Sequence, residues 1–500
     1  MNGKLVNFFH KVLDYKDSLF ISTVILVFIL LRIPSLIEPY WYGDEGIYQV
    51  IGQAMREGRI LYSEIWDNKP PLLYIIYALF NGDLFYIRFA SLISGVFSII
   101  FFFLLAKKLF KNRASVFVSV TFYSILFGLP LLEGNIANSE NFMHLPIIAA
   151  FYLIFTSQNK NRFLLTAVSG IFLSSAFLIK IVAVFDLAAL IISIFILRFY
   201  EDITLNGRNI RVQIKNIITS IEQESLLIIA FIFPIMITAL YFIFAQAFPD
   251  FYKAALSQNV GYVGHGNYFI FPMGFLFLKI ALLLFAILLI ARYRKILGPA
   301  GILILVWVVF SLFNALFSQR PYTHYLLVLL PSFSLFLGYI LDNKILLKLT
   351  IPILLILAIL IFQNFHFNLN KALSYYLNYS LFIMGVKSVR DYQAFFDRNT
   401  PNDYEIARFI TTKTAKHEEV FLWSDSAQIY ALSGKLPPGR YIVSYHITFY
   451  KDAIEETKKI IDEKKPKYII QTKDHPAISH FLDGYDLRYK LAGDVKVYER

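Results

Sequence analysis

The sequence contains no cysteine, so disulfide bonds, thiolate metal sites and cysteine nucleophiles are excluded. Charged residues are also scarce: they make up 16% of the 500 residues, against about 25% in soluble domains. Hydrophobic residues account for 57% of the chain, and the mean hydropathy is +0.58. Phe and Tyr are abundant, which suits lipid contact and the aromatic belts of membrane interfaces. This composition indicates a polytopic membrane protein.

Most of the positive charge lies in short segments between apolar runs. The formal net charge is +12, and the Lys- and Arg-rich segments include "KKLFKNR", "SQNKNR" and "RYRK". This charge indicates membrane topology and hardly indicates nucleic-acid binding. By the positive-inside rule, these segments are expected in the cytoplasm together with the N-terminus. The first apolar run, 18–37, lacks a small-residue cleavage site and is interpreted as an uncleaved first span.

The apolar runs predict a polytopic all-α membrane domain over residues 1–364. A spanning helix needs about 20 mostly apolar residues. Eleven spans are expected, near 18–37, 84–106, 114–132, 142–157, 163–179, 182–198, 225–247, 273–291, 298–317, 322–341 and 345–364. With a cytoplasmic N-terminus, an odd number of spans places the C-terminal region outside. An even number would place it in the cytoplasm, and the fifth and sixth spans, which only Lys180 and its neighbours separate, decide between the two.

The chain beyond residue 365 has a different pattern, in which amphipathic helices alternate with short apolar strands. Helices are expected at 402–415, 425–434 and 451–465, and strands at 418–424, 440–445, 467–472 and 494–499. Alternation of helix and strand is typical of α/β domains. The sequence therefore predicts a small extracytoplasmic α/β domain over 365–500.

The stretch "YWYGDEGIYQVIGQAMREGR" follows the first span and places two adjacent acids, Asp44 and Glu45, at the expected membrane edge. Apolar residues then recur at helical spacing until Gly58, which predicts a helix on the membrane surface. A carboxylate at the N-terminus of that helix is stabilised as the anion by free amides and the helix dipole. Spacing alone leaves two interpretations open. Either Asp44 is a reactive carboxylate, or it only caps the helix, with Glu45 as a first-turn acid.

A second apolar segment, "WDNKPPLLYIIYALFNG", is too short to cross a bilayer and is interpreted as interfacial or re-entrant. Pro70 and Pro71 are suited to the start of a helix. Lys69 precedes them, at the expected depth of the lipid headgroups. It is either a lysine that extends its ammonium group to the interface or a phosphate contact beside a helix N-terminus.

Further acids and cations fall at the same outer surface. They are Glu140 in the loop after the third span, Arg320 and His324 at the mouth of the tenth span, Lys180, and His265 in a Gly- and Tyr-rich loop. Lys180 and Asp186 are either functional groups or a structural ion pair, and the loop with His265 either covers a substrate or is a connector. Together, these side chains have the composition needed to hold a lipid-linked anion and to deprotonate a hydroxyl. A transporter is instead expected to carry its ionisable groups near the bilayer midplane.

Several motifs along the chain match a known family. Residues 43–80 combine the acidic pair with "KPPLLY" some two dozen residues later, 88–110 and 319–341 add weaker motifs, and 420–441 is similar to a soluble tail of many bacterial members. On these residues the chain resembles the integral-membrane glycosyltransferases of the GT-C superfamily. Within it, the chain is similar to the protein O-mannosyltransferases and aminoarabinose transferases of glycosyltransferase family 39 and its bacterial relatives.

The resemblance implies a polyprenyl-phosphate sugar donor, bound from the outer leaflet, and a hydroxyl acceptor in a lipid, a polysaccharide or a protein. It implies catalytic roles for Asp44, Glu45 and Glu140. Lys69 corresponds to a phosphate-contacting lysine. The expected substrate-binding set comprises Lys69, Arg320, His324, Tyr48, Lys180 and His265. Some relatives bind a divalent cation and others need none, and the sequence has no clear metal quartet, so no metal site is assigned.

The expected reaction is an inverting glycosyl transfer at the extracytoplasmic face of the cell membrane. Asp44 accepts the proton of the acceptor hydroxyl as general base. Lys69 and Arg320 stabilise the departing polyprenyl phosphate. Two other functions stay open: a transporter or flippase of polyprenyl-linked sugars, which needs no base at Asp44, and a non-catalytic scaffold whose tail binds a partner.

Overall fold

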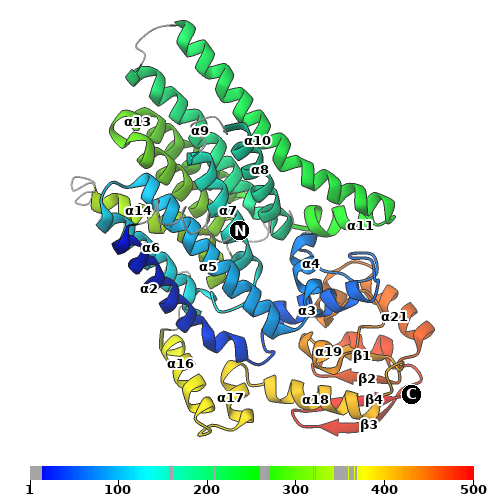
Figure 1. Cartoon of the computed structure of the whole chain (residues 1–500). Coiled ribbons are helices and arrows are strands. Elements are labelled where there is room, and N and C mark those ends of the chain that lie inside the picture. Colours follow the sequence, from blue (N-terminus) through cyan, green and yellow to red (C-terminus); the bar gives the residue numbers. More distant parts are fainter. Residues whose placement is uncertain are drawn as a thin grey trace, which may run out of the picture.

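The computed structural model describes residues 14–156, 162–205, 210–259, 267–268, 270–318, 320, 322–342, 359, 365 and 369–500. A bundle of long helices makes up one part of the molecule, and a small sheet with short helices makes up another (Figure 1). The bundle consists of α2 (Tyr15–Arg32), η1 (Ile33–Ile37), α5 (Leu84–Leu109), α6 (Arg113–Gly128), α7 (Ser139–Thr156), α8 (Arg162–Ile179), α9 (Val184–Leu205), α10 (Ile210–Phe244), α13 (Gly274–Ala315), η5 (Thr323–Leu329) and α14 (Leu330–Asp342).

Seven helical segments of the described chain are long and apolar enough to cross a membrane. They are Tyr15–Ile37, Leu84–Leu109, Arg162–Ile179, Ile181–Arg198, Ile221–Phe244, Gly274–Ala315 and Thr323–Asp342. The segment Gly274–Ala315 contains both spans predicted at 273–291 and 298–317. Gly298 has a positive φ of 66° and Pro299 follows it, so the helix is broken at this point, between the two predicted spans. The predicted span 345–364 lies outside the described residues apart from 359, and the number of spans stays a prediction.

Ion pairs join the helices at one end of the bundle. Lys107, in the last turn of α5, pairs with Asp17 at the start of α2, and Arg113 at the start of α6 pairs with Asp14. Asp14 also caps α2 by accepting a hydrogen bond from the N–H of Asp17 at 2.9 Å. An 18-residue helix is about 27 Å long. The cationic segment after α5 therefore lies far from Arg32, which ends α2 at the other end of the bundle.

Two surface helices, α3 (Gly43–Arg56) and α4 (Pro71–Leu79), lie between the bundle and the sheet region (Figure 1). They confirm the predicted helix after the first span and the short helix that begins at the proline pair. A Cβ at Gly52 would lie 2.8 Å from the backbone of Tyr77, so only glycine lets the two helices approach this closely. The short elements of the connecting loops are η2 (Pro130–Leu132), η3 (Ile181–Ala183), α11 (Phe248–Tyr252) and η4 (Lys253–Ser257).

The sheet of the C-terminal region has the strand order β1-β2-β4-β3. Strand β1 (Val420–Trp423) runs parallel to β2 (Tyr468–Gln471), while β4 (Val495–Glu499) is antiparallel to both β2 and β3 (Asp486–Leu491). The helices of this region are α18 (Thr400–Lys413), α19 (Gln428–Ser433), α20 (Ser444–Phe449), α21 (Ala453–Lys464) and η6 (Pro476–Phe481). The prediction of a small α/β region is confirmed.

The strand predicted at 440–445 is wrong. Residues 441–443 are buried, but they form no described strand, and Ser444 begins α20. The N–H of Ser444 donates to the carbonyl of Ser424 at 2.8 Å, just after the end of β1. The apolar run there reflects burial and not pairing within the sheet. Strand β3 was not predicted, because its residues are mostly exposed and give little apolar signal.

Two further helices, α16 (Leu369–Ile383) and α17 (Val389–Phe396), precede the sheet region. Tyr375, Tyr392 and Phe396 form a small buried cluster against which Trp41 packs. The hydroxyl of Tyr376 donates to the carbonyl of Leu31 at 3.2 Å. These helices therefore pack on the segment that ends the first span.

Candidate active site

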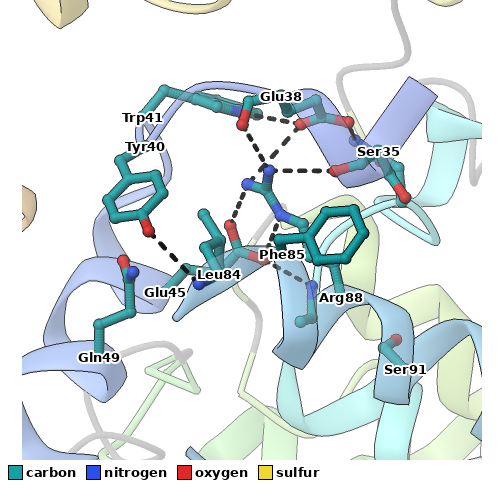
Figure 2. Close-up of polar contacts among 12 residues, drawn as sticks. Ser35, Glu38, Tyr40, Trp41, Glu45, Gln49, Leu84, Phe85, Arg88 and Ser91 are labelled. Atoms are coloured by element: carbon teal, nitrogen blue, oxygen red, sulfur yellow. Dashed lines mark hydrogen bonds and ion pairs between the residues drawn. The ribbon is translucent and has the colours of Figure 1, made fainter. Parts of the chain in front are cut away.

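A buried ion pair fixes the start of α3, as Figure 2 shows. Arg88 of α5 donates from Nη2 to Oε2 of Glu45 at 2.6 Å and from Nε to Oε1 at 3.2 Å. The Nη1 group of Arg88 donates to the carbonyls of Ser35 and Glu38 at 3.1 and 2.9 Å. The N–H of Ala137 donates to Glu45 at 2.8 Å. Both carboxylate oxygens of Glu45 are thus bonded within the protein, and the side chain is 1% exposed.

A second buried acid, Glu38, joins the same assembly (Figure 2). Its carboxylate accepts from Trp41 Nε1 at 2.9 Å, from Asn135 Nδ2 at 2.8 Å and from the Tyr375 hydroxyl. Burial raises the pKa of Glu38, against the opposing effect of Arg88 and these donors. The loop between the first span and α3 is therefore held by side chains from α5, α16 and the loop before α7.

A cavity of about 740 Å³ opens beside the N-terminus of α3. It brings together five of the predicted site residues: Asp44, Lys69, Glu140, Lys180 and His324. Apolar side chains make up much of the rest of the wall, from α8, α9, α13 and η5. A large apolar pocket with a few converging polar groups is typical of a ligand site. Glu45 is not among the described lining residues.

Asp44 lies in the first turn of α3, where the backbone N–H groups have no partner within the helix. The residue at the N-cap position is Tyr42, so Asp44 is not the cap. One turn later, the hydroxyl of Tyr48 donates to Oδ2 of Asp44 at 3.2 Å. Tyr48 is 1% exposed and its ring packs edge-on against Tyr74 and Tyr77. Tyr48 therefore holds the carboxylate of Asp44 from behind, and Asp44 faces the cavity.

Glu140, Lys180 and His324 lie together in the wall of the same cavity. Glu140 is fully buried in the first turn of α7, where it accepts from the ammonium of Lys180 and from Ser139 Oγ at 2.8 Å. His324 Nε2 lies 3.9 Å from Oε1 of Glu140. The ammonium of Lys180 also lies 4.7 Å from the centre of the Tyr325 ring. The sequence left open a Lys180–Asp186 pair, but the structure pairs Lys180 with Glu140.

An acid outside the predicted site, Glu133, orients His324. Its Oε2 lies 3.0 Å from His324 Nδ1 and accepts from the Tyr42 hydroxyl at 2.7 Å, while its Oε1 accepts from Thr323 at 2.6 Å. Burial opposes ionisation of Glu133, but the bonds with His324, Thr323 and Tyr42 outweigh it and lower the pKa of Glu133. The carboxylate thus favours a proton on Nδ1 and turns Nε2 toward the cavity. In the sequence, Glu133 is signalled only by the acidic character of its loop, "EGNIANSEN" at 133–141.

Lys69 enters the cavity from the segment before α4. Its ammonium donates to Asn68 Oδ1 at 2.9 Å. Its backbone is held on both sides: the N–H donates to the Tyr74 hydroxyl at 3.0 Å, and the carbonyl accepts from the Tyr62 hydroxyl at 2.7 Å. Pro70 is the N-cap of α4, so Lys69 lies beside a helix N-terminus, as predicted.

The remaining predicted residues are placed differently. Arg320 is half-buried just before η5 and is not among the described lining residues. His265 lies outside the described residues. Tyr445 of α20, from the C-terminal region, lines the cavity and was not predicted. No group of three or more His, Asp or Glu among the described residues is arranged to hold a metal ion.

Comparisons with known proteins identify the fold that carries this cavity. Residues 69–207 match the sequence model of the dolichyl-phosphate-mannose–protein mannosyltransferase family. ArnT from Cupriavidus metallidurans, solved with undecaprenyl phosphate, covers 96% of this chain and 97% of its own length at a TM-score of 0.52 and 14% identity. The chain has the GT-C glycosyltransferase fold. Ligand-free ArnT matches at a TM-score of 0.54 and 14% identity, covering 96% of this chain and 98% of its own.

The GT-C fold accounts for the membrane helices and the C-terminal sheet region together, because ArnT is matched over nearly its full length. The archaeal oligosaccharyltransferase AglB from Archaeoglobus fulgidus also aligns, at a TM-score of 0.49 and 12% identity, over 93% of this chain and 70% of its own. No curated protein sequence matches the chain. The GT-C fold and the family match support a multi-pass membrane glycosyltransferase.

Proposed function

We propose that the protein transfers a sugar from a polyprenyl-phosphate donor to a hydroxyl acceptor, with inversion at the anomeric carbon. The observation that carries this proposal is the cavity, which places the carboxylate of Asp44 in one space with Lys69, Lys180 and His324. A base for the acceptor and cations for a phosphate are the two requirements of this reaction. The structure of ArnT with undecaprenyl phosphate supports a polyprenyl phosphate as the lipid part.

In the proposed reaction, the acceptor oxygen bonds to the anomeric carbon as the bond between that carbon and the phosphate oxygen breaks. The proton of the hydroxyl moves to Asp44, and the electron pair of the broken bond leaves with the polyprenyl phosphate. Asp44 is held for this role by the hydroxyl of Tyr48, which donates to its carboxylate. The leaving group is already an anion, so it needs charge stabilisation more than a proton.

The phosphate is proposed to bind near Lys69 and the N-terminus of α4. Lys180 is neutralised in part by Glu140, so Lys69 and the doubly protonated ring of His324, which can donate from Nε2 while Nδ1 donates to Glu133, are the better candidates for direct phosphate contacts. Glu140 then serves to fix Lys180 and the first turn of α7. Glu45 is proposed to position α3 through Arg88, in place of the catalytic role that the family resemblance implies.

The site is proposed to face the extracytoplasmic side. Lys107 lies in the last turn of α5, and Arg113 begins α6 next to it. Arg88, which pairs with Glu45, lies near the start of α5 and therefore at the other end of that helix. Under the positive-inside rule, the end with Lys107 and Arg113 is cytoplasmic. The cavity, the sheet region and the acceptor then lie on the other side of the membrane.

The test uses purified protein in liposomes with a panel of radiolabelled polyprenyl-phosphate sugars and a crude envelope extract. We expect one donor to be consumed, with its sugar appearing in the extract at the opposite anomeric configuration. A product of retained configuration would contradict direct attack assisted by Asp44. Donors that cross the bilayer intact would instead support the transporter.

A further inference from the structure

A segment of the C-terminal region lies against the loop that carries Lys69 (Figure 1). Arg59 Nη1 donates to the carbonyl of Pro437 at 2.8 Å, and the N–H of Trp66 donates to the carbonyl of Arg440 at 2.9 Å. The ring of Trp66 packs edge-on against Tyr450 with 4.8 Å between centroids. Residues 59–70 and 437–450 are therefore bonded to each other, although most of the membrane bundle, from α5 to α14, separates them in sequence.

Helix α20 lies in this segment and reaches the site with two adjacent residues. Tyr445 lines the cavity that contains Asp44 and Lys69. His446 is 5% exposed, and its Nε2 lies 3.9 Å from Oδ1 of Asp67, a carboxylate that is also 5% exposed. Burial lowers the pKa of His446 to about 4, so its imidazole is neutral at pH 7.

Asp67 connects α20 to the backbone of Lys69. Its Oδ2 accepts from the Tyr74 hydroxyl at 2.7 Å, and the same hydroxyl accepts from the N–H of Lys69 at 3.0 Å. The ring of His446 thus packs close to Asp67 without a hydrogen bond, and Asp67 is joined to Lys69 by hydrogen bonds through Tyr74. A lysine side chain has many rotamers, so the place of its ammonium depends on how firmly its backbone is held.

We propose that helix α20 of the C-terminal region positions Lys69 for the donor phosphate through the buried His446–Asp67–Tyr74 contacts. This inference rests on the proposed function. It makes the C-terminal region part of the donor site, whereas a tail that only selects the acceptor would leave donor binding unchanged. His446, Asp67 and Tyr74 are positioning residues, because they act through Lys69.

The test measures the affinity of full-length protein for undecaprenyl phosphate in detergent. His446→Phe keeps a ring of similar size and removes the imidazole nitrogens, and Asp67→Asn removes the charge. Asp67→Asn is expected to weaken binding by about fivefold, because the Tyr74 hydroxyl then donates to a neutral acceptor in place of a charged one. His446→Phe breaks no hydrogen bond to Asp67 and is expected to weaken binding by a smaller factor. His417→Phe, at an exposed position of the same region, is the matched control and should leave the affinity unchanged.

The decisive comparison repeats these changes in a Lys69→Ala background. If α20 acts through Lys69, His446→Phe and Asp67→Asn cause no further loss there, since the residue that they position is gone. A general weakening of the fold would add its loss in both backgrounds, and that result would overturn the inference. Should His446→Phe fail to fold, Tyr74→Phe removes the link between Asp67 and Lys69 and is expected to give the same result.

The outcomes also separate this inference from the proposed function. If Lys69→Ala weakens binding of undecaprenyl phosphate while His446→Phe and Asp67→Asn do not, the inference fails and the donor site stands. If Lys69→Ala leaves the affinity unchanged, the phosphate-binding role of Lys69 fails, and the inference fails with it.

Discussion

The adjacent acids Asp44 and Glu45 have different surroundings, which leads to opposite predictions for their amide variants. In Glu45→Gln, the buried guanidinium of Arg88 loses its ionic partner at 2.6 Å. Removing one partner of a buried pair typically costs about 3–5 kcal/mol. Arg88 keeps its bonds to the carbonyls of Ser35 and Glu38, so the lower end, about 3 kcal/mol, is expected.

Asp44→Asn is the matched control. Asp44 is half-exposed to the cavity, and an amide oxygen can still accept from Tyr48. Substitutions at such positions usually change the free energy of unfolding by less than about 0.5 kcal/mol. Loss of the general base, however, is expected to reduce turnover by about 10²- to 10⁴-fold.

The assay compares apparent thermal midpoints in detergent with donor turnover per folded molecule. A cost of about 3 kcal/mol corresponds to a drop of about 3 °C in a chain of 500 residues. Glu45→Gln is therefore expected to lower the midpoint and keep much of the turnover, and Asp44→Asn is expected to do the reverse. If Glu45→Gln abolishes turnover at an unchanged midpoint, the positioning role of Glu45 is refuted.

Three further predictions concern the contacts around the site. A Cβ at Gly46 would lie 2.8 Å from the backbone of α19, whereas a Cβ at Gly43 would meet nothing within 4 Å. Gly46→Ala should therefore lower the thermal midpoint, and Gly43→Ala should leave it unchanged. Equal midpoints for the two variants would contradict this contact. Glu133→Gln removes the charge that orients His324 and is expected to lower donor turnover about tenfold, as for a bond to a charged group; unchanged turnover argues against that orientation. Burial raises the pKa of Asp403 to about 7, so the folded chain keeps a proton that the unfolded chain releases above about pH 4. Stability should therefore fall as the pH rises from about 4 to 7, and Asp403→Asn should flatten that part of the profile of thermal midpoint against pH; parallel profiles contradict it.

Local patterns were sufficient for the helices of the membrane part and for α3 and α4. Apolar runs of spanning length and the proline pair at the start of α4 depend only on nearby residues. Two separate spans were predicted at 273–291 and 298–317, and the helix is broken at Gly298, because its backbone is not helical and a proline follows it. The strand at 440–445 was wrong, since a short apolar run has the same pattern in a buried loop as in a strand.

Residues that line the cavity were predicted from sequence where their type is unusual for their place, as with Asp44 and Lys69. The separation of Asp44 from Glu45 depends on Arg88, which is distant in sequence and comes close only in the fold. Tyr445 gave no signal because tyrosine is common in this chain and its helix lies in the C-terminal region. The surroundings of these residues depend on side chains that are distant in sequence, and a local sequence pattern carries no information about such contacts.

The most direct test of the central claim is the rate at which the protein releases polyprenyl phosphate from its sugar donor in liposomes. With the donor identified from the panel, wild type and Asp44→Asn are compared at equal amounts of folded protein and saturating acceptor. The account predicts release coupled to sugar transfer by wild type and at least a hundredfold slower release by Asp44→Asn, as for a lost general base. Release at the same rate by both proteins would contradict it.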